Sequence, residues 1–80
     1  MTREAIIGRI RPIICEHLEQ RPEAVTETAD FGRDLGADSL DGVEMVIAIE
    51  EAFLIAIPDD AIDGITSLGA AADYVAGRLA

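Results

Sequence analysis

Apolar residues near the start of the chain recur every three or four positions, which is the spacing of one face of an α-helix. The residues that share this spacing are Ile6, Ile10, Ile14 and Leu18, with Ile7 and Ile13 beside them. Thr2 precedes the pattern and belongs to a residue type that caps helices, so it marks the expected start. Pro12 removes one backbone hydrogen bond, but the apolar pattern continues past it. The sequence therefore predicts one kinked helix rather than two.

A long connection from residue 19 to residue 38 follows, interrupted by proline and glycine, which break regular structure. Connections of this length inside small domains are usually functional or are held down by their own apolar side chains. The apolar side chains in this one are Val25, Phe31 and Leu35. We expect these three residues to pin the connection to the rest of the protein.

A second helix is predicted from about residue 39 to residue 54. Its buried side is expected to carry Leu40, Val43, Val46, Ile47, Ile49 and Phe53. Helical spacing places another set on a different face: Asp41, Glu44, Ala48 and Glu51. Glu50 falls at the rim of the apolar side, where its carboxylate can still reach water. The second helix should thus bury one face and present acidic side chains on another.

Two further helices are predicted after Pro58, a short one over residues 60–64 and a longer one over residues 68–78. Asp59 or Asp60 can cap the short helix, and Thr66 or Ser67 the longer one. The buried side of the last helix is expected to carry Leu68, Ala71, Ala72, Val75 and Leu79, with Tyr74 nearby. Residues 53–57 are compatible with a strand, but one strand cannot form a sheet. The predicted fold is therefore all-α, a small four-helix bundle with one short helix.

The chain has 80 residues, enough for one small domain over residues 1–80, and half of them are apolar. Only 4% are aromatic, so the core should be aliphatic. A domain of this size has a thin core and little room for a deep active site, which favours a module that other proteins act upon.

The formal net charge is −10 at pH 7, which argues against nucleic acid and anionic membranes as partners. Proteins with basic patches are the expected partners, because the charge would steer their encounter. Cys15 is the only cysteine, so no internal disulfide or cysteine cluster for metal can form. No secretory leader pattern and no apolar run of membrane-spanning length is present. We expect a soluble, cytoplasmic monomer that does not insert into membranes.

The sequence Asp38-Ser39-Leu40 lies where the long connection meets the predicted second helix. Free backbone N–H groups and the positive end of the helix dipole stabilise a phosphate at such a position. Serine and aspartate are also ordinary helix caps, and a cap alone requires nothing further along the chain. The Asp-Ser pair by itself therefore does not separate a phosphate attachment site from a simple cap.

The wider sequence separates them. Residues 31–44, FGRDLGADSLDGVE, resemble the signature of acyl carrier proteins of bacterial type II fatty acid synthesis. The resemblance extends upstream through residues 23–26 and downstream through residues 48–53, 57–60, 65–66 and 70–77. It covers nearly all of the chain after residue 16.

This resemblance implies that Ser39 receives 4′-phosphopantetheine from coenzyme A, through a phosphopantetheinyl transferase. The thiol of the arm would hold acyl groups as thioesters and present them to fatty acid or polyketide synthesis enzymes and other acyl-transfer enzymes, without catalysis by the carrier. The residues matching the acidic partner-binding face are Asp38, Asp41, Glu44 and Glu51. Those matching the lining of the acyl chain are Val43, Val46, Ile49, Ile57, Ile65, Leu68 and Ala71, for which plain core packing is a compatible role.

Several residues depart from the family pattern. Leu54-Ile55-Ala56 replaces a segment that is usually polar or acidic, so two bulky aliphatic side chains should remain near the surface or enlarge the core. Gly42 stands where a hydroxyl residue is usual, and Gly64 and Gly69 should loosen the third and fourth helices. With Pro12, these departures favour a second hypothesis: a specialised carrier for a polyketide, lipid or aminoacyl pathway.

Other classes of protein fit less well. A peptidyl or D-alanyl carrier also presents a modified serine, but the sequence around Ser39 and the acidic balance favour the acyl type. A serine hydrolase would need glycines flanking Ser39, and its only candidate base is His17, which we expect to face solvent. We expect Cys15 to be a small, buried apolar residue.

A calcium-binding loop is the remaining alternative, with acids at Asp30, Asp34, Asp38 and Asp41. Their spacing does not match an EF-hand, which places ligands at loop positions 1, 3, 5 and 12. We therefore predict no metal site.

Overall fold

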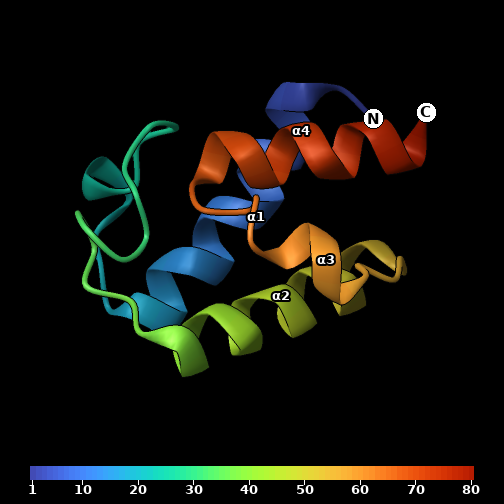
Figure 1. Cartoon of the computed structure of the whole chain (residues 1–80). Coiled ribbons are helices and arrows are strands. Elements are labelled where there is room, and N and C mark those ends of the chain that lie inside the picture. The colour runs from blue at the N-terminus through green and yellow to red at the C-terminus, as the bar shows by residue number, and fades with distance from the viewer.

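The structure, a computed structural model, describes residues 1–80 and contains helices but no strands. In chain order its elements are α1 (Arg3–Leu18), the short 3₁₀ helix η1 (Pro22–Ala24), α2 (Ser39–Phe53), α3 (Asp59–Ile62) and α4 (Leu68–Leu79) (Figure 1). The predicted all-α fold with three longer helices and one short helix is confirmed. No helix combines the length and the apolar character that crossing a lipid bilayer would require.

Local signals set the ends of α1. The Ala5 N–H donates to Thr2 Oγ1 (3.1 Å), so Thr2 caps α1 as predicted. The helix runs through Pro12 without ending, while the kink expected there stays a prediction. At its C-terminus Glu19 takes the left-handed conformation (φ 52°), and its N–H donates to the carbonyl oxygen of Cys15. This turn ends the helix and starts the long connection.

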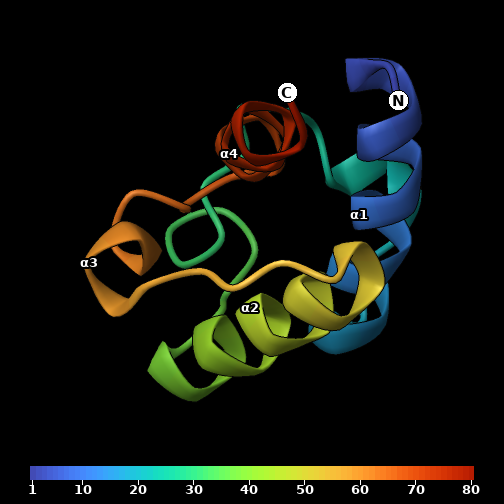
Figure 2. The ribbon, with the colours of Figure 1, turned by 90° about the vertical axis from the view of Figure 1, so that its right-hand side faces the viewer.

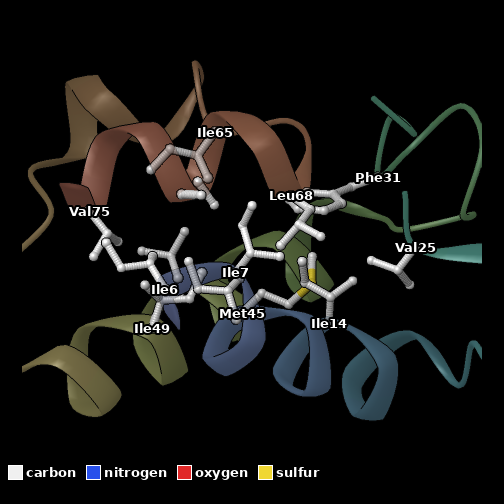
Figure 3. Packing of buried hydrophobic residues seen from close by; sticks show 14 of the residues in the cluster. Ile6, Ile7, Ile14, Val25, Phe31, Met45, Ile49, Ile65, Leu68 and Val75 are labelled. Carbon is white, nitrogen blue, oxygen red and sulfur yellow. The ribbon is translucent and has the colours of Figure 1, made fainter. Parts of the chain in front are cut away.

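The core lies between α1, α2 and α4, with α1 packed against both other long helices. Figure 2 looks along α4, with α1 on one side and α3 on the other. Seventeen buried apolar residues form one cluster, in which Phe31 and Phe53 are the only aromatic residues, so the predicted aliphatic core is confirmed. Figure 3 shows side chains from the three helices and the long connection meeting in it. No polar or charged residue is buried.

The long connection packs onto the start of α4. Val25, Phe31 and Leu35 are all buried, as predicted. The Phe31 N–H donates to the carbonyl oxygen of Thr66 (2.9 Å). The Gly69 N–H donates to the carbonyl oxygen of Glu27 (3.0 Å), and a Cβ at residue 69 would lie only 3.0 Å from that same oxygen. Gly69 is therefore buried where two backbones approach closely, a position that requires glycine. The sequence predicted only that Gly69 would loosen α4.

The predicted buried side of α2 is partly wrong. Leu40, Val43 and Ile47 are exposed by 64%, 47% and 47%. The residues of α2 that enter the core are Met45, Val46, Ile49 and Phe53. These four residues share one face at helical spacing, whereas the three exposed residues project from the other side. Because α2 carries apolar residues on both sides, its periodicity alone does not identify the buried one.

Three smaller predictions also need correction. Leu79 is 43% exposed because it is the last residue of α4, at the end of the chain rather than over the core. The cap of α3 is Pro58, without a side-chain hydrogen bond, and Asp59 is the first helical residue. Gly64 lies after α3 and therefore does not loosen it. Ser67 does cap α4, since the Ala70 N–H donates to Ser67 Oγ (3.2 Å).

Candidate functional site

Ser39 is the first residue of α2 and is exposed, but it is not the helix cap. The cap is Asp38, whose Oδ1 accepts the Asp41 N–H (2.8 Å). Asp41 reciprocates, because its Oδ2 accepts the Asp38 N–H (3.0 Å). This reciprocal pair is a capping box, and it brackets Ser39 on both sides. The Ser39 hydroxyl is thus left free for chemistry, which the sequence alone did not decide.

The start of α2 also suits an anion bonded to Ser39. The Asp41 N–H is taken by the cap, and the Gly42 N–H donates to the carbonyl oxygen of Asp38 (3.1 Å). The N–H groups of Ser39 and Leu40 lie in the first turn, where the helix offers them no acceptor. These two donors and the positive end of the helix dipole favour a phosphate at this point. The residues present therefore fit a phosphodiester on the Ser39 oxygen.

The end of the long connection holds Ser39 on a hydrogen-bonded platform. Asp30 Oδ2 accepts the N–H groups of Gly32 (3.0 Å) and Arg33 (2.8 Å), and Asp34 Oδ2 accepts the N–H of Asp30 (2.8 Å). Gly36 has φ +75°, a conformation that glycine adopts without strain. These bonds order the turn immediately before α2.

The carboxylates of Asp30 and Asp34 therefore accept hydrogen bonds from the loop backbone, and Asp34 also pairs with Arg33. Hydrogen bonds from the Arg33 guanidinium, and then from the Asp30 N–H, lower the pKa of the Asp34 carboxyl below its ordinary value. No group of three histidine, cysteine or acidic side chains in the structure could hold a metal ion.

The predicted acidic face is largely present on α2. Asp38, Glu44 and Glu51 are exposed, while Asp41 is half-buried with its carboxylate in the capping box. Glu44 and Glu51 line one shallow groove of about 320 Å³. The other residues that line it are His17, Ile47 and Ala48. The exposed apolar residues Leu40, Val43 and Ile47 lie on the same helix and were assigned to the core from the sequence.

The residues predicted to line an acyl chain fall into two groups. Six belong to the buried core cluster: Val46, Ile49, Ile57, Ile65, Leu68 and Ala71. Val43 does not, because it is 47% exposed on the outer side of α2. The Ile57 N–H donates to Glu50 Oε2 (2.7 Å), so the half-buried Glu50 ties the end of α2 to the connection before α3. The expected position of Glu50 at the rim is thus correct, and the hydrogen bond gives it a partner.

His17 is exposed, as predicted, and is poorly placed to activate Ser39. The groove beside it runs along α2 from Glu44 to Glu51, and these residues follow Ser39 by five and twelve positions. At 1.5 Å per residue, they lie about 8 to 18 Å along the helix axis from Ser39. The positions of His17 and Ser39 therefore do not resemble a nucleophile beside its base. Cys15 is half-buried and packs against the core cluster.

An exposed serine at a capped helix start, within an acidic helical bundle, is a geometry that suits a phosphate-linked group. Residues 8–75 match the family described as a phosphopantetheine attachment site. The chain is 53% identical over 74 residues to the acyl carrier protein of Phenylobacterium zucineum (strain HLK1), covering 92% of this chain and 94% of that one. It is 48% identical over 80 residues to the acyl carrier protein of Guillardia theta, covering 100% and 99% of the two chains.

The fold comparison agrees with the sequence comparison. The solved structure of the acyl carrier protein from Enterococcus faecalis superposes with a TM-score of 0.82 at 34% identity, covering 96% of this chain and 98% of that one. The chain belongs to the acyl carrier protein family. Members of this family are carriers rather than catalysts.

Proposed function

We propose that Ser39 is the residue that carries 4′-phosphopantetheine. The observation that supports this assignment is the capping box, because Asp38 and Asp41 cap α2 and leave the Ser39 hydroxyl exposed and free. Coenzyme A is the donor and a phosphopantetheinyl transferase is the catalyst. Ser39 Oγ attacks the phosphorus atom next to pantetheine, a new P–O bond forms, and the bond to the departing adenosine 3′,5′-bisphosphate breaks. The hydroxyl proton passes to a base of the transferase.

The arm supplies a terminal thiol that holds acyl groups as thioesters. The chain itself supplies an exposed attachment point at the end of α2 and a platform that fixes its direction. Tethering keeps the acyl group at high local concentration near any enzyme that docks on the carrier. Carrying, rather than reacting, is the function that this small domain supports.

The acidic residues of α2 give the docking surface its charge. Asp38, Glu44 and Glu51 are exposed at intervals along α2 from the attachment point toward its far end, so they are available to basic patches on partner enzymes. Asp41 acts mainly through the cap, because its carboxylate accepts the Asp38 N–H. The acidic helix would steer acyl-transfer and synthesis enzymes toward Ser39.

The six buried residues named above are the proposed lining for the acyl chain. They come from α2, the segments around α3, and α4, and they are entirely aliphatic. A chain entering here would replace contacts between apolar side chains, with no buried polar residue in the way. Val43 is at most an outer contact, since nearly half of it is exposed.

Fatty acid synthesis in the cytoplasm is the pathway that we propose, supported by relatives that span the whole chain. The second candidate is a specialised polyketide, lipid or aminoacyl pathway, favoured by the exposed Leu54 in a segment that is usually polar in the family. Identification of the acyl group on protein isolated from its own cell separates the two. A straight-chain fatty acyl series supports the first candidate, and a polyketide or an amino acid supports the second.

The attachment is tested by incubating the apo protein with coenzyme A and a phosphopantetheinyl transferase of broad specificity, followed by intact mass measurement. The mass should rise by one phosphopantetheine group in the wild type and not in Ser39→Ala. Ser67→Ala is the matched control, because Ser67 is the only other serine and its hydroxyl is occupied as the α4 cap. Failure of the wild type to gain mass with several active transferases would overturn the proposal.

A further inference from the structure

Most of the large hydrophobic residues that the protein exposes lie on the outer side of α2 or at its end. Six large hydrophobic residues are exposed in the whole chain, and four of them lie on this helix or at its end. These four are Leu40, Val43, Ile47 and Leu54, which we call the outer apolar stripe. Leu40, Val43 and Ile47 share one side of α2 at helical spacing, and Leu54 follows at the end of the helix. Leu54 is the most exposed, at 90%.

Folding does not explain a leucine at residue 54. Leu54 ends α2 in the left-handed conformation, with φ 55° and ψ 46°. Glycine and asparagine are the residues that adopt this conformation readily, and a helix usually ends with one of them here. Glu19 ends α1 in the same conformation, but Glu19 is polar, whereas Leu54 is a large apolar side chain that is 90% exposed and contributes nothing to the core.

The backbone around Leu54 is fixed on both sides by arginines from other helices. Arg9 of α1 donates from Nη2 to the carbonyl oxygen of Ala52 (2.6 Å). Arg78 of α4 donates from Nη1 to the carbonyl oxygen of Ala56 (2.6 Å). These two bonds flank Leu54 by two residues on each side. A side chain displayed from a fixed backbone loses less entropy on binding than one from a mobile loop.

Three further interactions complete this support. The Ile55 N–H donates to the carbonyl oxygen of Glu50 (3.1 Å), which closes the last turn of α2. Ile55 packs against the core cluster, whereas its neighbour Leu54 points into solvent. The guanidinium carbon of Arg9 lies 4.7 Å from the centre of the Phe53 ring, which anchors the residue before Leu54. These interactions hold the backbone of residues 52–56 in place, and Leu54 is the residue of this segment whose side chain is most exposed.

The charges beside the stripe indicate what covers it. Helix α2 has no basic residue, and Glu44 and Glu51 are exposed along the same helix. The whole chain carries a net charge of −10. A second copy would bring an equally acidic face against this one, and the two would repel. A partner with a basic rim around an apolar socket would be attracted.

We infer that Leu54 is an apolar anchor for a partner enzyme, and that it extends the docking surface from Ser39 to the far end of α2. The inference rests on the proposed function, because it assumes that enzymes dock on α2. Ser39 and Leu54 are fifteen residues apart, which corresponds to about 22 Å along a helix. The partner should therefore have an apolar socket about 22 Å from the point where the arm enters, flanked by lysine or arginine side chains. Partners without that socket bind through the acidic residues alone.

Leu54→Asn and Leu54→Gly test this inference, because both residues suit the left-handed backbone and should not weaken the fold. Leu79→Asn is the matched control, since it removes another exposed leucine from the end of α4. The holo form of each protein is titrated against the purified acyl-transfer enzymes encoded in the same genome. Thermal unfolding of each variant is recorded alongside.

For at least one enzyme, both Leu54 variants should raise Kd about tenfold, the size expected for losing one buried leucine. That loss should persist at 0.5 M salt, because it is apolar, and Leu79→Asn should bind as the wild type does. The melting temperatures of the Leu54 variants should equal or exceed that of the wild type. Equal Kd values for wild type and both Leu54 variants across all the enzymes that bind would overturn the inference. So would a wild-type dimer that the Leu54 variants convert to monomers, because the occupant would then be a second copy.

Failure of the proposed function would look different. In that case the wild type would not accept phosphopantetheine on Ser39, and no acyl-transfer enzyme would bind it. If the Leu54 inference alone fails, the wild type still loads and still binds these enzymes, and only the Leu54 variants lack the expected defect.

Discussion

Asp38 has two separable tasks in this account, capping α2 and contributing charge beside Ser39, and two substitutions tell them apart. Asp38→Ala removes both the carboxylate that accepts the Asp41 N–H (2.8 Å) and its charge. Asp38→Asn keeps an oxygen acceptor and removes only the charge. Asparagine caps helices as well as aspartate does, whereas alanine does not.

The expected losses follow from these two contributions. Losing the cap costs about 1 kcal/mol, and losing the attraction between the carboxylate and the helix dipole costs about 0.5 kcal/mol. Asp38→Ala should therefore lower the free energy of unfolding by about 1.5 kcal/mol, and Asp38→Asn by about 0.5 kcal/mol. For a domain of this size, about 1 kcal/mol between the variants corresponds to a difference of roughly 4–8 °C in Tm.

Thermal and urea unfolding followed by circular dichroism measure these differences, and transferase kinetics measure the charge. Both variants should load more slowly than the wild type at low salt, by roughly twofold to fivefold, and the gap should narrow as salt rises. An Asp38→Ala protein as stable as Asp38→Asn would refute the cap. The role of the charge would be refuted if Asp38→Asn loaded at the wild-type rate at low salt.

Three other substitutions probe the rest of the structure. Gly69→Ala places a Cβ 3.0 Å from the carbonyl oxygen of Glu27 and should lower the free energy of unfolding, measured with urea, by about 1–3 kcal/mol. The control is Gly77→Ala, whose Cβ would meet nothing within 4 Å, so it should be neutral or stabilising. Equal effects of the two substitutions would contradict the close approach at Gly69. Glu51→Lys should weaken enzyme binding at low salt and much less at 0.5 M, and a loss that salt does not reduce would mean that Glu51 acts through packing. Asp34→Asn should be less stable than the wild type at pH 7. That difference should shrink as the pH falls below the ordinary pKa of 3.8 and through the lowered folded-state pKa, because the carboxylate contributes this stability only while it stays charged. A difference that is unchanged between pH 7 and pH 2 would contradict this.

Local signals in the sequence were sufficient for much of the fold. Thr2 and Ser67 cap α1 and α4 as predicted, because a cap involves residues only three positions apart. The buried pins of the long connection were also predictable, since Phe31 and Leu35 are the large apolar side chains in an otherwise polar segment.

Features that depend on distant residues were not predictable. The close approach at Gly69 involves Glu27, which lies 42 positions earlier in the chain, so the glycine looked like a weak point in a helix. The buried face of α2 was misassigned because both of its sides are apolar. Met45 enters the core and Leu40 does not, and only the packing of α1 against α2 decides between them.

The candidate site shows the same division. The Asp-Ser pair placed the site at the start of α2, but either residue could have been the cap. The structure assigns the cap to Asp38 and its reciprocal bond to Asp41, which frees Ser39. The two arginines that bind the segment around Leu54 come from α1 and α4. Their hydrogen bonds to this segment therefore could not be predicted from the local sequence.

The attachment of the arm to Ser39 is tested most directly by tandem mass spectrometry of peptides from the loaded protein. The structure predicts that the phosphopantetheine mass lies on the peptide containing Ser39, at that residue, and that the peptide containing Ser67 is unmodified. Modification of Ser67, of a threonine or of Cys15 in a protein whose Ser39 stays free would contradict the account.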